Sequence, residues 1–276
     1  MKRIAVIGAG NMGAALIGGV LKGGVAGRGE VRATVRTAER ASELAAKYGI
    51  CVTAGDNRAA AEDADIVVLA VKPGTLPKVL EEIRPALRPS QILLSLAAAF
   101  PIALIEKLTD CAMPVFRAMP NIPVVVEEGA TAVAANAHCT AEQRATIEDI
   151  FRAVGVVVFV EEELMHAVTA LSGSGPAYVY MVIEALIAGG LKMGLSREVS
   201  TRLAEQTVLG AAKLVRETML HPAILRDQVI TPGGTTISAI HELEKHGLRS
   251  MLISAIETAT RHSENRTREL VAKFGE

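Results

Sequence analysis

The chain has 276 residues, half of them hydrophobic, and its 29 Lys and Arg residues nearly balance its 30 Asp and Glu residues. This much apolar sequence excludes a disordered chain and is enough for one large core or two smaller ones. The balanced charge provides no long-range field toward nucleic acid or an anionic membrane surface, so neither is expected as a partner. Any bound anion must therefore be held by local groups.

The cysteines and the amino-terminal residues indicate neither a metal site nor a targeting segment. Cys51, Cys111 and Cys139 are too widely spaced for a CxxC motif, so we expect idle thiols in a reducing compartment and no metal. A strand pattern begins at once, without the apolar stretch of a signal peptide. Polar residues or proline interrupt the apolar stretches 92–105 and 176–191, which do not resemble a membrane span. We expect a soluble, cytoplasmic protein.

Strand and helix patterns alternate along the first part of the chain. Short apolar runs rich in β-branched residues predict strands, and helical spacing predicts the segments between them. In chain order we expect a strand over 4–7, a helix over 12–21, a strand over 31–35, a helix over 38–48, and strands over 66–71 and 92–96. This order predicts an α/β fold with a doubly wound, mostly parallel sheet.

The sequence pattern changes in the later part of the chain. Strands are expected over 115–119, 131–135 and 156–160, with a helix that opens at Thr140, whose spacing from Gln143 is that of a capping box. From Leu164 to Lys273 the patterns are helical. We therefore expect a Rossmann domain over residues 1–162 and an all-helical domain over 163–276.

The stretch from Pro176 to Gly190 is apolar nearly all round. A helix that is apolar on every face must be buried on every face. A helical domain of about 110 residues seldom encloses such a helix by itself, so we predict that it packs against a second subunit. Burial inside one subunit is the alternative.

The segment Gly8-Ala9-Gly10-Asn11-Met12-Gly13 matches GxGxxG between the first strand and the first helix. Gly8 would permit the tight turn, Gly10 the approach of a pyrophosphate, and Gly13 close packing of helix and strand. The helix N-terminus, beginning at Asn11 and Met12, offers free amides and a partial positive charge to phosphates. The sequence therefore predicts a bound nicotinamide dinucleotide and a reductase.

The end of the second predicted strand indicates which dinucleotide binds. A carboxylate there would accept hydrogen bonds from the adenosine ribose and repel a 2′-phosphate. The chain instead has Arg36 and Thr37, a cation and a hydroxyl, which favours NADPH, with NADH possible. Alternatively, Arg36 points into solvent.

Two loop segments follow strands at the carboxyl edge of the predicted sheet, where ligands bind in open α/β folds. They are Ala70-Val71-Lys72-Pro73 and the segment 117–123. Lys72 is a candidate proton donor, or it merely covers the cofactor. No Ser/His/Asp arrangement or paired-carboxylate motif is visible, so cofactor and positioning are expected to carry the chemistry.

Two small-residue segments in the helical half precede helices. The first, 171–176, contains Ser172 and Ser174, and the second, 231–236, contains two glycines flanked by three threonines. Each is expected to present hydroxyls and unpaired N–H groups at a helix N-terminus, which suits a carboxylate. Simple helix capping is the alternative for both.

These residues resemble the pyrroline-5-carboxylate reductase family along essentially the whole chain. The most specific segments are 169–178, Gln206-Thr207 with Gly210-Ala211-Ala212, and 225–237, with further likeness at 70–73 and 117–123. The resemblance implies NADPH-dependent reduction of the C=N bond of 1-pyrroline-5-carboxylate to L-proline, the last step of proline biosynthesis. It also implies a homodimer through the helical domain, and some members assemble into rings of dimers.

The resemblance also assigns residues. It implies that Thr231 and the backbone of Gly233, Gly234 and Thr235 hold the carboxylate of the cyclic imino acid substrate. Ser174 would belong to the same site, and Thr236 would hydrogen-bond the imine nitrogen. Asn57 resembles the family's contact to the ribose phosphate of the cofactor. The chain departs from the family at Arg36-Thr37-Ala38, where a Ser-Pro or Thr-Pro step is common.

Two other interpretations of the function remain open. One is another two-domain Rossmann reductase, acting on a different imine or on a 3-hydroxyacid; the latter would place a catalytic lysine on the long helix, which has none before Lys192. The other is an NADPH-sensing regulatory protein, which would not need the 231–236 loop.

Overall fold

The computed structural model describes residues 2–275, and they divide into two compact units. The first unit comprises Met1–Ser174 with Thr258–Glu276, and the second comprises Gly175–Glu257. The predicted division after residue 162 differs from this one in two places, because residues 163–174 and the end of the last helix stay with the first unit. Leu270 of that helix is 3% exposed and belongs to a core cluster of the sheet unit, which explains the second difference.

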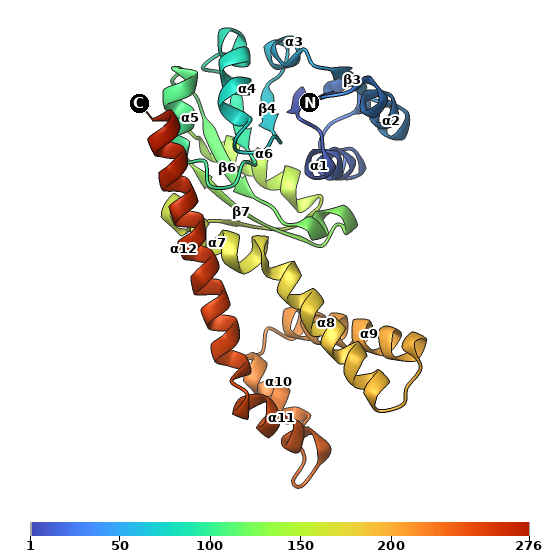
Figure 1. The fold of residues 1–276 in the computed structure, drawn as a ribbon. Helices are drawn as coiled ribbons and strands as arrows, with labels where there is room; N and C mark the ends of the chain where they lie inside the picture. The colour runs from blue at the N-terminus through green and yellow to red at the C-terminus, as the bar shows by residue number, and fades with distance from the viewer. Residues whose placement is uncertain (1, 276) are drawn as a thin grey trace. The chain divides into compact units, whose positions relative to one another are not determined.

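The first unit is built on one eight-stranded sheet (Figure 1). Its strand order is β3-β2-β1-β4-β5-β6-β7-β8. The strands are β1 (Ile4–Ile7), β2 (Val31–Val35), β3 (Cys51–Ala54), β4 (Ile66–Leu69), β5 (Ile92–Ser95), β6 (Val115–Met119), β7 (Gly129–Ala135) and β8 (Gly155–Phe159). All neighbours pair in parallel except β6 and β7. The predicted doubly wound, mostly parallel sheet is confirmed.

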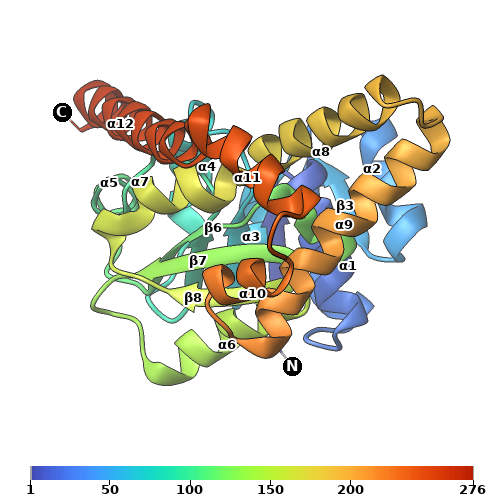
Figure 2. The same ribbon diagram turned by 90° about the horizontal axis from the view of Figure 1, so that it is seen from below.

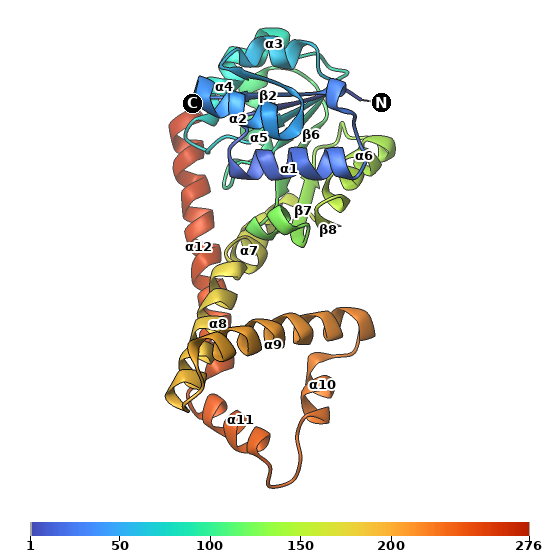
Figure 3. The ribbon, with the colours of Figure 1, turned by 90° about the vertical axis from the view of Figure 1, so that its right-hand side faces the viewer.

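Helices cover both faces of the sheet. One face carries α1 (Asn11–Lys22), α2 (Ala38–Tyr48) and α6 (Ala141–Arg152), and the other carries α3 (Asn57–Glu62), α4 (Leu76–Ile83), α5 (Ile102–Thr109) and α7 (Met165–Val168). In β1 the side chains alternate, with Ile4 and Val6 in one core cluster and Ala5 and Ile7 in the other. Figure 3 shows α1 below the strands and α3 above them. The chain order changes direction at β1, between β2 and β4, and such a switch point opens a ligand crevice.

Short 3₁₀ turns connect several of these elements. They cover Arg28–Glu30, Arg84–Ala86, Ile122–Val126 and Glu162–Leu164. Figure 2 shows β7 and β8 side by side, with α6 next to β8. The predicted capping box of α6 is present, since Thr140 accepts from the Gln143 N–H and Gln143 accepts from the Thr140 N–H.

The second unit is helical, as predicted. It contains α8 (Gly175–Lys192), α9 (Arg197–Thr218), α10 (Pro222–Gln228), α11 (Thr235–Lys245) and the start of α12 (Leu248–Phe274). Helices α8 and α9 pack closely at Gly190, where a Cβ would lie 2.6 Å from Ser200 Oγ. No residue of α8, Gly190 included, is buried. Several of its large apolar side chains, among them Val179 and Met181, are exposed.

One helical stretch in the described residues, Glu162–Lys192, is long and apolar enough to cross a membrane by length and composition, with a mean hydropathy of 1.3. Length and composition therefore do not decide the expectation that this apolar stretch is not a membrane span, and it stays a prediction. Helices that pack inside soluble proteins satisfy the same criterion.

Candidate functional site

A cavity of about 780 Å³ lies in the sheet unit at the switch point between β1, β2 and β4. It is formed by the carboxyl ends of these strands and the loops and helices that follow them. Eight of the predicted cofactor residues line it: Gly8, Gly10, Arg36, Thr37, Asn57, Ala70, Val71 and Lys72. Four others, Asn11, Met12, Gly13 and Pro73, flank these positions without lining the cavity. Segments separated by more than sixty residues thus meet at one site.

The glycine loop has the geometry that a close-bound phosphate group requires. Gly8 has φ +80°, and a Cβ there would lie 2.3 Å from Val71 Cγ1. A Cβ on Gly10 would meet only the Gly8 carbonyl oxygen, at 3.9 Å, so this side of the loop is open. Gly13 is buried, with Val6 Cγ1 3.1 Å from the position of a Cβ. These three positions match the turn, approach and packing roles of the motif.

The first turn of α1 faces the loop with uncompensated donors. The N–H groups of a helix's first turn have no partner within the helix. Gly10 is the N-cap and offers no side-chain acceptor, and no acidic residue lies in this turn. The amides of Asn11, Met12 and Gly13 therefore suit an anion such as a pyrophosphate.

The end of β2 carries two cations and no acid. Arg36 is exposed at the cavity. Arg40, on the first turn of α2, also lines it. Arg40 is paired with Glu43 at 2.6 Å, so Arg36 is the freer of the two. Thr37 caps α2 by accepting from the Arg40 N–H at 3.3 Å. This arrangement suits a 2′-phosphate.

Glu39 is an acidic neighbour that the sequence analysis did not consider. Hydrogen bonds from its own backbone N–H and from the Thr37 side chain lower the pKa of the Glu39 carboxyl. Arg36 is left as the principal cation at this end of the cavity.

Asn57 sits in a hydrogen-bonded chain at the cavity wall. Its Oδ1 accepts from the Thr34 hydroxyl at 2.6 Å, and its Nδ2 donates to Glu82 Oε2 at 2.8 Å. Thr34 is 1% exposed and also lines the cavity. Sequence reasoning missed Thr34 and Glu82, because neither belongs to a motif and both act through a residue far from them in the chain.

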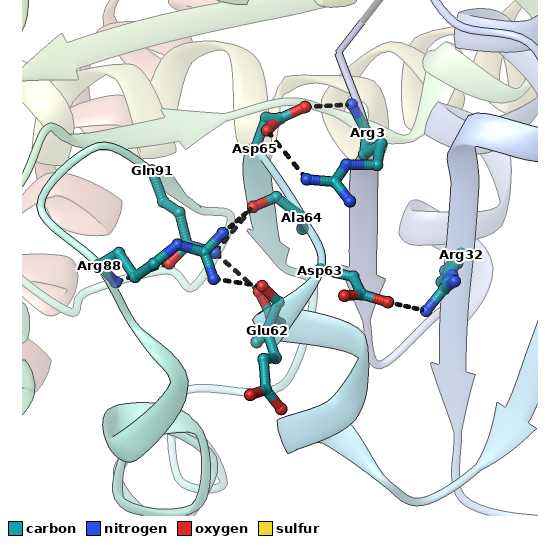
Figure 4. Close-up of polar contacts among 9 residues, drawn as sticks. Arg3, Arg32, Glu62, Asp63, Ala64, Asp65, Arg88 and Gln91 are labelled. Carbon is teal, nitrogen blue, oxygen red and sulfur yellow. Dashed lines mark hydrogen bonds and ion pairs between the residues drawn. The ribbon is translucent and has the colours of Figure 1, made fainter.

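The loop after α3 is fixed at the opposite end of the strands (Figure 4). Arg3 binds Asp65, and Arg32 binds Asp63 at 2.7 Å. Arg88 donates to the carbonyl oxygens of Glu62 and Ala64. These contacts hold the end of α3 and the start of β4, and thereby the helix that begins with Asn57.

The segment 117–123 has a structural role in this unit. Arg117 is 3% exposed and binds Glu162 at 2.9 Å, and Glu162 also accepts from the Ile102 N–H at the start of α5. Asn121 accepts from the Ala130 N–H and donates to the Ser172 carbonyl oxygen. This segment therefore connects β6, β7 and the helical stretch after β8.

The expected turn at 171–176 is wrong. Thr169–Gly173 forms a π-helical turn, and the Ser174 N–H donates to the Thr169 carbonyl oxygen at 2.8 Å. The hydroxyl of Ser172 donates to the Val168 carbonyl oxygen. The Ser174 N–H and the Ser172 hydroxyl are therefore already bonded to the preceding helical turns, and α8 follows at once from Gly175 without an intervening loop. Single π turns inside helices frequently mark functional positions.

The second predicted loop does form a helix N-terminus. Gly234 is the N-cap of α11 without a side-chain acceptor, and Thr235 and Thr236 are the first two helical residues. Gly233 has φ +69°, and a Cβ on Gly234 would lie 2.3 Å from Thr231 Oγ1. Both glycines are therefore needed for this turn, in which the Gly234 N–H donates to the Thr231 carbonyl oxygen at 3.0 Å. The turn brings the first N–H groups of α11 and threonine hydroxyls together, as a carboxylate site requires.

Among residues 2–275 no group of three or more His, Cys, Asp and Glu side chains is arranged to hold a metal ion. The thiol of Cys139 donates to Asn136 Oδ1 and to the Val115 carbonyl oxygen, and burial raises its pKa to about 11.

Two family models match the chain. Residues 162–266 match the model described as pyrroline-5-carboxylate reductase dimerisation. Residues 3–99 match the model described as NADP oxidoreductase coenzyme F420-dependent. The first covers α8 to α11, and the second covers the glycine loop, Arg36, Asn57 and Lys72.

Similar proteins cover the chain from end to end. A pyrroline-5-carboxylate reductase of Pseudomonas aeruginosa is 40% identical over 275 residues, 99% of this chain and 98% of the relative. A solved structure of a pyrroline-5-carboxylate reductase from Coxiella burnetii has a TM-score of 0.90 at 39% identity and covers 98% of both chains. A Plasmodium falciparum pyrroline carboxylate reductase solved with NADP bound has a TM-score of 0.86 at 30% identity, covering 96% of this chain and 98% of the other.

Proposed function

Because the chain belongs to the pyrroline-5-carboxylate reductase family, we propose that it reduces the C=N bond of 1-pyrroline-5-carboxylate to L-proline with NADPH, the last step of proline biosynthesis. The observation that carries the proposal is identity of 40% over 275 residues, combined with a glycine-lined cavity at the switch point of the sheet. The enzyme is an NAD(P)H-dependent oxidoreductase of the CH–NH class.

The cavity residues fit the cofactor. We assign the pyrophosphate to the amides of Asn11, Met12 and Gly13, next to the open side of Gly10. Arg36 and Thr37 would hold the 2′-phosphate, which is the basis for preferring NADPH over NADH. Asn57 would contact the adenosine ribose and its phosphate. Ala70, Val71, Lys72 and Pro73 lie at the end of β4, on the other side of the glycine loop.

Bound NADPH would supply the hydride that the imine carbon accepts. The residues of the chain then have to bind the substrate, orient it and stabilise the charge on its nitrogen. A cyclic imine protonates readily, and the protonated form accepts a hydride more easily, so no strong acid is required. Lys72 is left as a residue that covers the cofactor.

The 231–236 loop would hold the substrate. We assign the substrate carboxylate to Thr231 and the backbone of Gly233, Gly234 and Thr235, and Ser174 to the same site. The Thr236 hydroxyl would hydrogen-bond the nitrogen of the ring. A bond that strengthens as the imine becomes an amine gives preferential transition-state binding on the order of 1 to 3 kcal/mol.

We further propose a homodimer assembled through residues 163–276, with rings of dimers as a possible higher assembly. The support is that α8 exposes apolar side chains along its length and falls inside the match to the dimerisation model. Because the same match includes Glu162–Lys192, we assign the apolar surface of this stretch to a protein interface rather than to lipid. We accordingly place the enzyme in the cytoplasm, without a membrane or nucleic-acid partner.

The proposal is tested by following absorbance at the nicotinamide band with pyrroline-5-carboxylate and each cofactor in turn. We expect oxidation of NADPH that depends on the imino acid, with a lower kcat/KM for NADH. A six-membered cyclic imine and a 3-oxoacid, each offered with the reduced cofactor, serve as alternative substrates in parallel assays. Turnover of either one in preference to pyrroline-5-carboxylate would assign the chain a different reaction.

A further inference from the structure

Glu82, a residue outside every motif of the sequence, is bound to a residue of the cofactor cavity. Its Oε2 accepts from Asn57 Nδ2 at 2.8 Å, and its Oε1 accepts from the Asn57 backbone N–H at 3.2 Å. One carboxylate therefore accepts hydrogen bonds from both the side chain and the backbone of Asn57. Glu82 is exposed and does not itself line the cavity, whereas Asn57 does.

The contact is the last link of a chain in which every donor points the same way. The Gly8 N–H lies 3.3 Å from Thr34 Oγ1, and the Thr34 hydroxyl donates to Asn57 Oδ1 at 2.6 Å. The Asn57 amide then donates to Glu82. Since a carboxylate only accepts, it requires the NH₂ group of Asn57 on its side and leaves the oxygen facing Thr34. A flipped amide would turn its oxygen toward the Glu82 carboxylate and lose that bond, whereas the Thr34 hydroxyl could still accept from the turned NH₂ group, so Glu82 is the contact that fixes the orientation.

The two helices that carry this contact are held firmly in place. On α4, Leu76, Val79, Leu80 and Ile83 are each at most 5% exposed. On α3, Ala60 and Ala61 are buried, and the end of the helix is fixed by the arginine contacts of Figure 4. Rigid supports of this kind let a single side-chain contact set a rotamer.

We propose that Glu82 is a positioning residue for the dinucleotide: it fixes the orientation of the Asn57 amide, so that the remaining N–H and oxygen lone pair of that amide face the cavity ready for the cofactor. This inference rests on the proposed use of the cavity for NADPH. Preorganised groups bind more tightly because they lose less side-chain freedom on binding.

The loss of Glu82 is expected to weaken binding of the adenosine half of the cofactor. Asn57, Thr34 and Arg36 lie at the ends of β2 and β3, and the end of β2 is the adenosine-ribose side of this fold. Losing Glu82 should therefore weaken NADPH and its fragment 2′,5′-ADP by similar factors. Bonds of this kind contribute about 1 kcal/mol each, so a loss of roughly five- to tenfold in affinity is expected.

The test measures Kd for NADPH and for 2′,5′-ADP by isothermal titration calorimetry, without turnover. The variants are Glu82→Ala, the shape-matched Glu82→Gln, Asn57→Ala and the double variant Asn57→Ala with Glu82→Ala. Glu81→Ala, at an exposed neighbouring position on α4, is the matched control. Thermal melts of the unliganded proteins identify any variant that fails to fold, in which case Glu82→Gln carries the same prediction with a smaller loss.

The proposal expects Glu82→Ala to weaken both ligands when Asn57 is present and to have no further effect when Asn57 is already alanine, since both changes act through one amide. Three results would overturn it: an unchanged Kd, tighter binding through removal of a negative charge, or an equal loss in the Asn57→Ala background. If the unaltered protein binds neither ligand, the proposed function itself fails. If it binds both and Glu82→Ala changes nothing, only the role of Glu82 fails.

Discussion

His166 on α7 lies with its Nδ1 3.0 Å from the hydroxyl oxygen of Ser263 on α12, 97 residues further along the chain. Burial, and secondarily the nearby charge of Arg117, lower the pKa of His166, while Glu264 and Glu162 act in the opposite direction. The imidazole is therefore kept neutral where the last helix returns to the sheet unit. Protonation would place a charge beside the buried guanidinium of Arg117.

The first prediction concerns the pH dependence of stability. In the unfolded chain His166 binds a proton near its ordinary pKa of about 6.5, and in the folded chain only at lower pH, so acid favours unfolding. We expect the urea midpoint to fall as pH drops from about 7.5 toward 5 and to fall less in His166→Gln, which keeps a hydrogen-bonding group for Ser263. His138→Gln, at an exposed position, is the control. Identical pH profiles for the His166 variant and the unaltered protein would contradict the assignment.

The second prediction concerns the choice of cofactor. Arg36→Glu exchanges the freer cation at the end of β2 for a carboxylate that repels a 2′-phosphate and accepts from a ribose hydroxyl. We expect the ratio of kcat/KM for NADPH to that for NADH to fall by about tenfold or more, the equivalent of 1.4 kcal/mol. Lys47→Glu makes the same charge change at an exposed position on α2 that does not line the cavity. An unchanged ratio in Arg36→Glu would show that Arg36 does not contact the 2′-phosphate.

The third prediction separates two glycines of one loop. Gly10→Ala adds a methyl group that meets nothing closer than 3.9 Å, whereas Gly8→Ala places it 2.3 Å from Val71 at φ +80°. We expect Gly10→Ala to fold normally and to bind NADPH about tenfold or more weakly, because the methyl group fills the space a phosphate needs. Gly8→Ala should lower the melting temperature as well. Gly29→Ala, with open space around it, should change neither quantity.

Normal NADPH binding by a well-folded Gly10→Ala protein would place the pyrophosphate elsewhere. Calorimetry and thermal melts on the same samples distinguish the two effects, since a loss of binding with an unchanged melt reports on the site alone.

The fourth prediction concerns the proposed hydrogen bond to the ring nitrogen. Thr236→Ala removes the hydroxyl and should lower kcat by about tenfold or more, because the bond is strongest in the transition state. Dimerisation, followed by analytical ultracentrifugation, should persist. Thr218→Ala, which removes an exposed threonine hydroxyl that is bonded within α9, is the control. Full activity of Thr236→Ala would mean that another group hydrogen-bonds the ring nitrogen of the substrate.

The sheet and the glycine loop could be predicted from the sequence because their patterns are local. β1, β2 and α2 have the predicted bounds, since each is a run of residues with one period between clear breakers. β3 was missed because three of its four residues are exposed at the sheet edge, which leaves no apolar pattern. The antiparallel pairing of β6 with β7 follows from a connection too short for a crossover.

The parts of the site that escaped prediction depend on contacts between distant residues. Small residues at 171–176 suggested a turn, yet the backbone stays helical through a π turn whose hydrogen bond spans Thr169 and Ser174. The contact of Glu82 with Asn57 joins residues 25 apart, and it exists only once α3 and α4 pack together. A single sequence carries no periodic signal for such a contact.

The most direct test of the assigned reaction follows the transferred atom. NADPH in which both hydrogens at the reactive carbon of the nicotinamide are replaced by deuterium is incubated with the enzyme and pyrroline-5-carboxylate, and the product is analysed by mass spectrometry. The account predicts L-proline carrying the deuterium on Cδ, the ring carbon next to nitrogen that does not bear the carboxylate. Unlabelled proline, or no proline while the cofactor is consumed, would contradict hydride transfer to the C=N bond.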